Sequence, residues 1–129
     1  MRGLIGYTGF VGGNILQQAE FDMFYNSSNI QNIRGKSFDL LVCAGASSLV
    51  WLANKEPEKD LEAINKLISS LQHVKVKKFI LVSTIYIYPK PIGVDEDSEI
   101  DATNLQPYGK HRFLLENFVR KHFDAIIVR

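Results

Sequence analysis

Three glycines near the start of the sequence have the spacing of a phosphate-binding turn. Gly6, Gly9 and Gly12 lie three positions apart and follow the short apolar run of Leu4 and Ile5. A phosphate must approach backbone N–H groups closely at the N-terminus of a helix, and a Cβ atom at that place would block it. The spacing G-x-x-G-x-x-G differs from the G-x-G-x-x-G dinucleotide fingerprint. On this motif alone, a structural glycine turn is an equal alternative.

The segments that would position these glycines alternate between apolar runs and helical periodicity. Apolar runs predict strands at residues 4–5, 21–25, 38–44, 79–82 and 125–128. Helices are predicted at residues 14–19, from 57 to about 73, and from 107 onward. The buried stripe of the last helix is predicted to be Leu114, Leu115, Phe118 and Val119. The polar segments 26–36 and 86–103 indicate surface loops. Strands separated by helices favour parallel pairing, so we expect a single α/β domain over residues 1–129.

Composition limits the classes to which this protein can belong. A hydrophobic fraction of 46% and a net charge of +1 are typical of one globular domain. No clustered basic face indicates nucleic-acid binding, and the lysines of residues 75–78 are expected to form a solvated connection between a helix and a strand. Cys43 is expected in the core of a protein from a reducing compartment. Because no leader or long apolar stretch is present, we expect a cytoplasmic location without membrane contact.

Four stretches, in order along the chain, carry a family resemblance. They are Gly6-Tyr7-Thr8-Gly9-Phe10-Val11-Gly12, Cys43-Ala44-Gly45-Ala46, Val82-Ser83-Thr84-Ile85-Tyr86-Ile87-Tyr88, and Tyr108-Gly109-Lys110-His111-Arg112 with Glu116 after it. Together they resemble the extended branch of the short-chain dehydrogenase/reductase superfamily, which contains NAD-dependent epimerases and dehydratases. The resemblance implies a Rossmann-like parallel sheet with helices on both faces. It also implies an NAD or NADP site at Gly6, Thr8, Gly9, Phe10, Val11, Gly12, Asn26, Ser27, Ala44, Gly45, Ala46 and Arg112.

The same resemblance implies a catalytic set of Thr84, Tyr108 and Arg112. Tyr108 would be the general acid/base at the reacting oxygen, and Thr84 would hydrogen-bond that oxygen. A nearby cation stabilises a phenolate, and Arg112 lies one helical turn after Tyr108. The family has lysine where this sequence has Arg112, and a planar guanidinium is not equivalent to a compact ammonium. His111 also replaces a small residue, so catalysis is less well supported than cofactor binding.

Polar and aromatic residues outside these motifs have less specific interpretations. Asn26 falls where a carboxylate would select NAD, so both NAD and NADP are permitted. Arg34 could pair with a 2′-phosphate, although a solvated loop arginine is favoured. Trp51 is expected to cover the core, with Asn54 near a passing ligand. The acidic segment with Asp95, Glu96, Asp97, Glu99 and Asp101 lacks the residue order of a calcium loop, so no metal is expected.

We therefore expect an NAD(P)-dependent oxidoreductase, epimerase or dehydratase acting on a nucleotide-sugar-like or other hydroxyl or carbonyl substrate. A dinucleotide-binding module without turnover is the main alternative, and a plain α/β interaction domain is the third. Family members continue beyond the strand matching residues 125–128 to build the substrate site, so we expect this sequence to be either a truncated product or a minimal relative without most of a substrate pocket. Relatives often dimerise through helices matching residues 57–73 and 107–122, so a homodimer is a further expectation.

Overall fold

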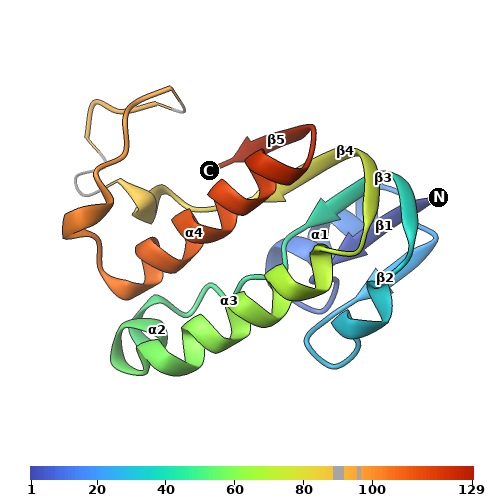
Figure 1. Cartoon of the computed structure of the whole chain (residues 1–129), viewed down its shortest axis with the longest axis horizontal. Coiled ribbons are helices and arrows are strands. Elements are labelled where there is room, and N and C mark those ends of the chain that lie inside the picture. The colour runs from blue at the N-terminus through green and yellow to red at the C-terminus, as the bar shows by residue number, and fades with distance from the viewer. Residues whose placement is uncertain (89–91, 96) are drawn as a thin grey trace.

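Five parallel strands form one sheet in the order β2-β1-β3-β4-β5 (Figure 1). The computed structural model describes residues 1–88, 92–95 and 97–129. Its strands are β1 (Arg2–Ile5), β2 (Met23–Tyr25), β3 (Ser37–Cys43), β4 (Lys75–Val82) and β5 (Ala125–Val128). β1 pairs with β2 and β3, β3 pairs with β4, and β4 pairs with β5, each in parallel. The predicted parallel α/β sheet is confirmed.

Helices cover both faces of this sheet, which makes the single domain Rossmann-like, as the resemblance implied. They are α1 (Phe10–Gln18), α2 (Val50–Lys55), α3 (Pro57–Leu71) and α4 (Pro107–His122). Three short 3-10 turns follow the strands or precede α4, namely η1 (Ile30–Ile33), η2 (Ile85–Ile87) and η3 (Ala102–Asn104). α3 and α4 lie side by side on one face, and α1 lies behind the sheet (Figure 1). No helix among the described residues is long and apolar enough to span a membrane.

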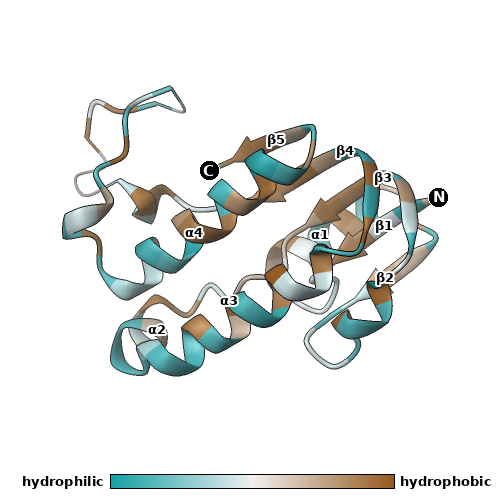
Figure 2. Ribbon diagram, in the orientation of Figure 1, coloured by the Kyte–Doolittle hydropathy of each residue, from teal (hydrophilic) through white to brown (hydrophobic). Residues whose placement is uncertain are grey.

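The main core lies between the sheet and the α3–α4 layer. Its strand residues include Ile5, Leu41, Cys43, Phe79 and Leu81, and its helix residues include Ile64, Leu67, Leu71, Leu115 and Val119. The strands carry the most hydrophobic stretches of the molecule (Figure 2). Cys43 is fully buried, as expected, and burial raises the pKa of its thiol to about 11. Because β1, β3 and β4 are neighbouring parallel strands, their carboxyl ends lie at the same end of the sheet.

The opposite face of the sheet is covered unevenly. Leu4, Val42, Ile80 and Ile126 are register partners and form one row across it. Exposure along this row is 0% at Leu4 and 6% at Val42 but reaches 48% at Ile126. α1 contacts β1, so its cover ends before β5.

Two predicted boundaries are wrong, each for a local reason. α1 begins at Phe10 rather than at residue 14, because Gly9 is its N-cap and the helix starts directly after it. The lysines at 75, 77 and 78 belong to β4 rather than to a connection. Lys77 pairs with Asp39 of β3 at 3.1 Å and Lys78 pairs with Asp124 at 3.0 Å, while Val76 and Phe79 of the same strand pack in the core.

Other corrections concern helices and loops. Trp51 does not cover the core, since it lies on the unpredicted helix α2 with 65% of its surface exposed. Leu114 is 43% exposed, because the buried face of α4 instead carries Tyr108, His111, Arg112, Leu115, Glu116 and Val119. Ion pairs allow those polar residues to be buried, and apolar periodicity cannot anticipate this. The segments predicted as surface loops also bury Ile30, Ile33 and Ile87.

Candidate functional site

The glycine turn is built by backbone packing so tight that two positions exclude any side chain. Gly6 has a φ of +89°, and a Cβ on it would lie 2.3 Å from the Ala44 carbonyl oxygen. A Cβ on Gly12 would lie 1.9 Å from the Gly6 carbonyl oxygen. α1 therefore rests directly on the turn, and the turn rests directly on the end of β3.

Gly9 differs from these two glycines because the space around it is open. A Cβ there would meet only the Gly6 carbonyl oxygen, at 3.5 Å. Gly9 is the N-cap of α1, and no side chain in the described part of the sequence caps that end. The first N–H groups of the helix lack partners within it, and the helix dipole favours a negative charge at this point. The N-terminus of α1 can therefore receive a phosphate.

A cavity of about 420 Å³ opens at this helix end. The predicted cofactor residues that line it are Gly6, Thr8, Gly9, Phe10, Val11, Asn26, Ser27, Ala44, Gly45 and Ala46. Gly12 lies beneath the turn and Arg112 lies behind the wall, so neither lines the cavity. Ile30, Ala63 and Leu67 add an apolar wall to the lining. The lining thus combines the backbone of the glycine turn with apolar side chains against which a flat ring could pack.

The loop that follows β2 closes the cavity beside that apolar wall. The Asn26 side-chain oxygen accepts a hydrogen bond from Ser28 N at 2.9 Å, and Asn26 N donates to the side-chain oxygen of Asn29 at 2.7 Å. Lys66 of α3 donates from Nζ to the Ser27 carbonyl oxygen at 2.9 Å. Arg34 is exposed and is not part of the cavity lining.

The predicted catalytic residues Thr84 and Tyr108 come from two segments in close contact. A Cβ on Gly109 would lie 2.1 Å from the Tyr86 carbonyl oxygen, so the start of α4 packs against the η2 turn. The rings of Tyr86 and Tyr108 meet edge to face at 5.7 Å. Thr84 begins the η2 turn, with its hydroxyl oxygen accepting from Tyr86 N at 3.2 Å. The structure therefore brings Tyr108 beside the turn that Thr84 opens.

Asn54 has a role that the sequence did not suggest. Its side-chain oxygen accepts a hydrogen bond from Tyr108 N at 3.0 Å. The residue at the N-cap position of α4, Gln106, makes no side-chain cap of its own. Asn54 of α2 therefore caps α4 from a neighbouring element and fixes the backbone that carries Tyr108.

Arg112 is buried in a network of charges and does not line the cavity. Its side chain is 3% exposed, and its Nη1 donates to a carboxylate oxygen of Asp60, which is 8% exposed. Its Nη2 donates to the Ser47 carbonyl oxygen at 2.8 Å, and its guanidinium carbon lies 4.0 Å from the centre of the Tyr108 ring. His111 Nδ1 lies 2.5 Å from the same Asp60 oxygen. Arg112 Nε has no hydrogen-bond partner among the described residues. Through Ser47, Arg112 contacts the back of the cavity wall.

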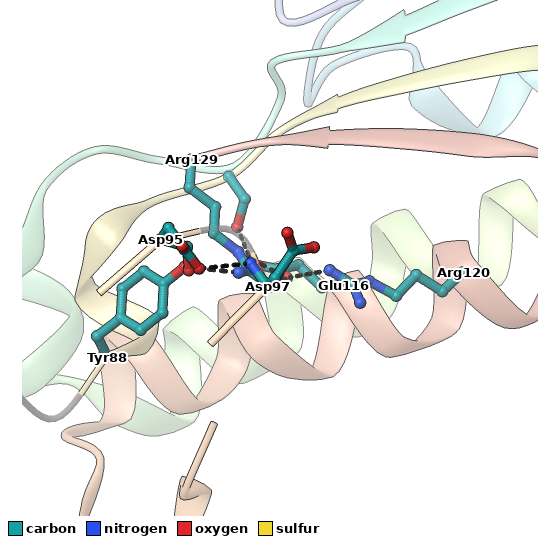
Figure 3. Close-up of polar contacts among 7 residues, drawn as sticks. Tyr88, Asp95, Asp97, Glu116, Arg120 and Arg129 are labelled. Atoms are coloured by element: carbon teal, nitrogen blue, oxygen red, sulfur yellow. Dashed lines mark hydrogen bonds and ion pairs between the residues drawn. The ribbon is translucent and has the colours of Figure 1, made fainter. Parts of the chain in front are cut away.

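A second buried ion network joins the ends of β4 and β5 to Glu116 within α4. Glu116 is fully buried and accepts hydrogen bonds from Ser83 Oγ at 2.5 Å and from Arg129 Nη2 at 2.7 Å. Arg129 also donates from Nη1 to the Tyr88 hydroxyl oxygen at 2.7 Å, and it lies between Tyr88 and Glu116 (Figure 3). Burial alone would lower the pKa of Arg129, but its bonds to Glu116 and Tyr88 outweigh that effect and raise the pKa. This network fixes Ser83 directly before Thr84.

Metal-ligating side chains do not gather anywhere in residues 1–88, 92–95 and 97–129: no group of three or more His, Cys, Asp or Glu residues could hold an ion. Glu96, one of the acids considered for a metal, lies outside the described residues. The polar groups of the candidate site are backbone N–H donors, hydroxyl groups and the cationic side chains of Lys66 and Arg112.

Sequence reasoning missed the residues that α3 contributes. Ala63, Lys66 and Leu67 line the cavity, and Asp60 holds Arg112. On the sequence they belong to an ordinary amphipathic helix, and no motif distinguishes them. Only the packing of α3 beside the loop after β2 gives them a place in the site.

Comparison with solved structures shows the same fold in sugar-nucleotide enzymes. A dTDP-4-dehydrorhamnose reductase from Clostridium acetobutylicum matches with a TM-score of 0.74 at 19% identity, over 100% of this chain and 52% of that one. A dTDP-4-dehydrorhamnose reductase from Bacillus anthracis, in complex with NADP, matches with a TM-score of 0.71 at 22% identity, over 99% and 52%. A UDP-glucose 4-epimerase from Thermotoga maritima matches with a TM-score of 0.67 at 16% identity, over 100% and 55%.

These identities establish a shared fold, and the chain spans about half the length of each of these proteins. No family model matches the sequence, and no curated protein sequence matches it.

Proposed function

We propose that this protein binds NAD or NADP and belongs to the epimerase, dehydratase and reductase class acting on nucleotide-sugar-like or other hydroxyl or carbonyl substrates. The observation that carries the proposal is the cavity at the uncapped N-terminus of α1, lined by most of the residues that the sequence motifs singled out. The names of the three fold relatives support the nucleotide-sugar substrate class.

The described residues fit the adenosine diphosphate half of such a cofactor. The open space at Gly9 and the free N–H groups of α1 suit a pyrophosphate. The wall of Ile30, Ala63 and Leu67 suits an adenine ring, which would bury its apolar faces there. Ala44, Gly45 and Ala46 leave room along the ends of the strands because their side chains are small or absent.

The chemistry proposed for this chain is proton movement at a substrate oxygen. A bound nicotinamide would supply or accept the hydride. The Tyr108 hydroxyl would exchange the proton of the substrate oxygen, and Thr84 would hydrogen-bond the same oxygen. Arg112, 4.0 Å from the Tyr108 ring centre, would contribute positive charge, while Asn54 fixes the tyrosine backbone.

Binding can be tested by calorimetry with NAD(H) and NADP(H). Gly9→Val should abolish measurable binding, because its branched side chain would enter the space of the pyrophosphate. Gly13→Ala is the matched control: it adds a side chain to the same helix, where the Cβ would meet only the Tyr7 carbonyl oxygen, at 3.7 Å. Equal affinity of the parent and the folded Gly9→Val variant would overturn the proposed site.

A dinucleotide-binding module without turnover is the second candidate, and the arrangement of Arg112 favours it. Two of the donor groups of Arg112 are bound to Asp60 and Ser47. Turnover of a nucleotide-linked keto sugar by the parent protein, lost in Tyr108→Phe with cofactor affinity unchanged, would support the enzyme. Cofactor binding with no turnover by the parent would support the module.

A further inference from the structure

The geometry of the cavity indicates where the adenosine ribose would lie, provided that the proposed dinucleotide site is correct. In a Rossmann-like fold the pyrophosphate lies at the first helix, and the ribose hydroxyls face the tip of the second strand. Here that tip is Asn26, directly after β2, followed by Ser27. Both residues line the cavity together with the glycine turn and the apolar wall.

A single ammonium group lies at this tip. Lys66 Nζ is 2.9 Å from the Ser27 carbonyl oxygen, so the lysine reaches from α3 across to the loop after β2. Lys66 is exposed, and a lysine ammonium on a flexible stem can turn from a carbonyl to a phosphate without moving the backbone. The bond from the ammonium to a neutral carbonyl oxygen would be replaced by an ion pair with a phosphate oxygen.

The charge of the lining favours an anion at this place. Of the described residues that line the cavity, Lys66 is the only one with an ionisable side chain. None of the described residues that line the cavity carries a carboxylate that would repel a phosphate or hold the two ribose hydroxyls. The side-chain oxygen of Asn26 is bound to Ser28 N, and Arg34 lies outside the lining.

We infer that Lys66 binds the ribose 2′-phosphate and that the cavity therefore prefers NADP(H) to NAD(H). A lysine on α3, rather than a residue of the glycine turn or of the β2 tip, would then determine cofactor choice. The inference adds cofactor choice to the proposed function, and it can fail while that function stands.

Calorimetry with two pairs of ligands tests it: NADP⁺ against NAD⁺, and adenosine 2′,5′-bisphosphate against 5′-AMP. The parent should bind the 2′-phosphorylated member of each pair more tightly. Lys66→Gln should weaken that member about 10- to 100-fold, the range for losing a hydrogen bond to a charged group. The affinity of the Lys66→Gln variant for NAD⁺ and 5′-AMP should change by less than about twofold, as expected for the loss of an exposed charge. Lys66→Arg should keep most of the preference.

Lys59→Gln is the matched control, because it removes the same charge from the same helix, where Lys59 pairs with Glu56 outside the cavity lining. It should leave both ligand pairs unchanged. An equal loss of NAD⁺ and NADP⁺ affinity in Lys66→Gln, or a parent that binds NAD⁺ at least as tightly as NADP⁺, would overturn the role of Lys66 and leave the dinucleotide site standing. If neither dinucleotide nor 5′-AMP binds the parent, the proposed function itself falls, and the inference falls with it.

Discussion

The glycine turn and the Tyr108–Arg112 segment are held in place by opposite means. At the turn, backbone packs against backbone, because a Cβ on Gly12 would lie only 1.9 Å from the Gly6 carbonyl oxygen. At the start of α4, buried charged groups hold the segment in place. Arg112 and His111 both contact Asp60, and the side chains of Arg112 and Asp60 are each less than a tenth exposed. The first region keeps its hydrogen-bond donors open, whereas in the second region two donor groups of Arg112 are bound to Asp60 and Ser47.

The two regions therefore differ in how easily a ligand could reach their hydrogen-bond donors. A phosphate could enter the turn without displacing a side chain, because the N-terminus of α1 has no side-chain cap among the described residues. A substrate that needed the charge of Arg112 would have to compete with Asp60 and Ser47. The N-terminus of α1 is therefore open, whereas the start of α4 is held by buried charges.

The largest expected effect comes from breaking the backbone packing of the turn. Gly12→Ala should destabilise the protein by at least about 3 kcal/mol, because overpacking against rigid backbone cannot relax. Urea unfolding followed by circular dichroism measures this loss. Gly9→Ala is the control and should change stability by less than about 1 kcal/mol, since its Cβ enters open space. Similar losses in the two variants would show that the turn is not packed as described.

Removing the central cation of the α4 network should have the next largest effect. Arg112→Met keeps much of the side-chain volume but leaves Asp60 with His111 alone, so we expect a loss of about 3 kcal/mol. The double variant Arg112→Met with Asp60→Asn should recover part of it, because no unpaired carboxylate remains buried. A double variant as unstable as the sum of the two single variants would exclude coupling between the pair.

Cys43 lies between the two regions, as the register partner of Ile5 on β1 and Leu81 on β4. Burial raises the pKa of the Cys43 thiol from 9.0 to about 11. Well below pH 9 the thiol is therefore neutral in both the folded and the unfolded protein, and burying it costs no stability. Above that pH the unfolded thiol ionises first, and the fold should lose about 2 kcal/mol by about pH 11. Unfolding free energies of the parent and Cys43→Ala, compared from about pH 8 to about pH 11, measure this difference. A constant difference would mean that Cys43 is accessible in the fold.

The smallest expected effect concerns Asn26, which lines the cavity at the glycine turn. Asn26→Asp should shift the ratio of NADP to NAD affinity toward NAD by about fivefold, because two unit charges near 4 Å apart in water interact by ~1 kcal/mol. Competition between the two cofactors in a fluorescence titration measures the ratio. An unchanged ratio would place the 2′ position away from the tip of β2.

The parts of the site that sequence reasoning found are local. Gly6, Gly9 and Gly12 are recognisable because a close backbone approach demands glycine at fixed spacing. The parallel sheet followed from apolar runs separated by helices, and all five strands were located. The start of α1 was missed because its first turn contains Gly12 and Gly13, which are poor helix formers in isolation.

The parts that it missed depend on contacts between distant residues. Lys66 meets Ser27 across 39 positions, and Asp60 meets Arg112 across 52. Nothing in the sequence near Asp60 or Lys66 marks them, since each occupies a normal polar position of an amphipathic helix. Asn54 is similar, because its partner is the backbone N–H of Tyr108 on another helix.

The uneven cover of the sheet has a consequence for the motions of the fold. β3 and β1 lie inside the sheet, while β5 is bonded on one side, to β4, and leaves Ile126 and Val128 each 48% exposed. Local opening requires the least loss of buried surface at such an edge, so we expect backbone amides of β5 to exchange with solvent hydrogen faster than those of β3. Amide protection should therefore fall across the sheet from β3 toward the β5 edge.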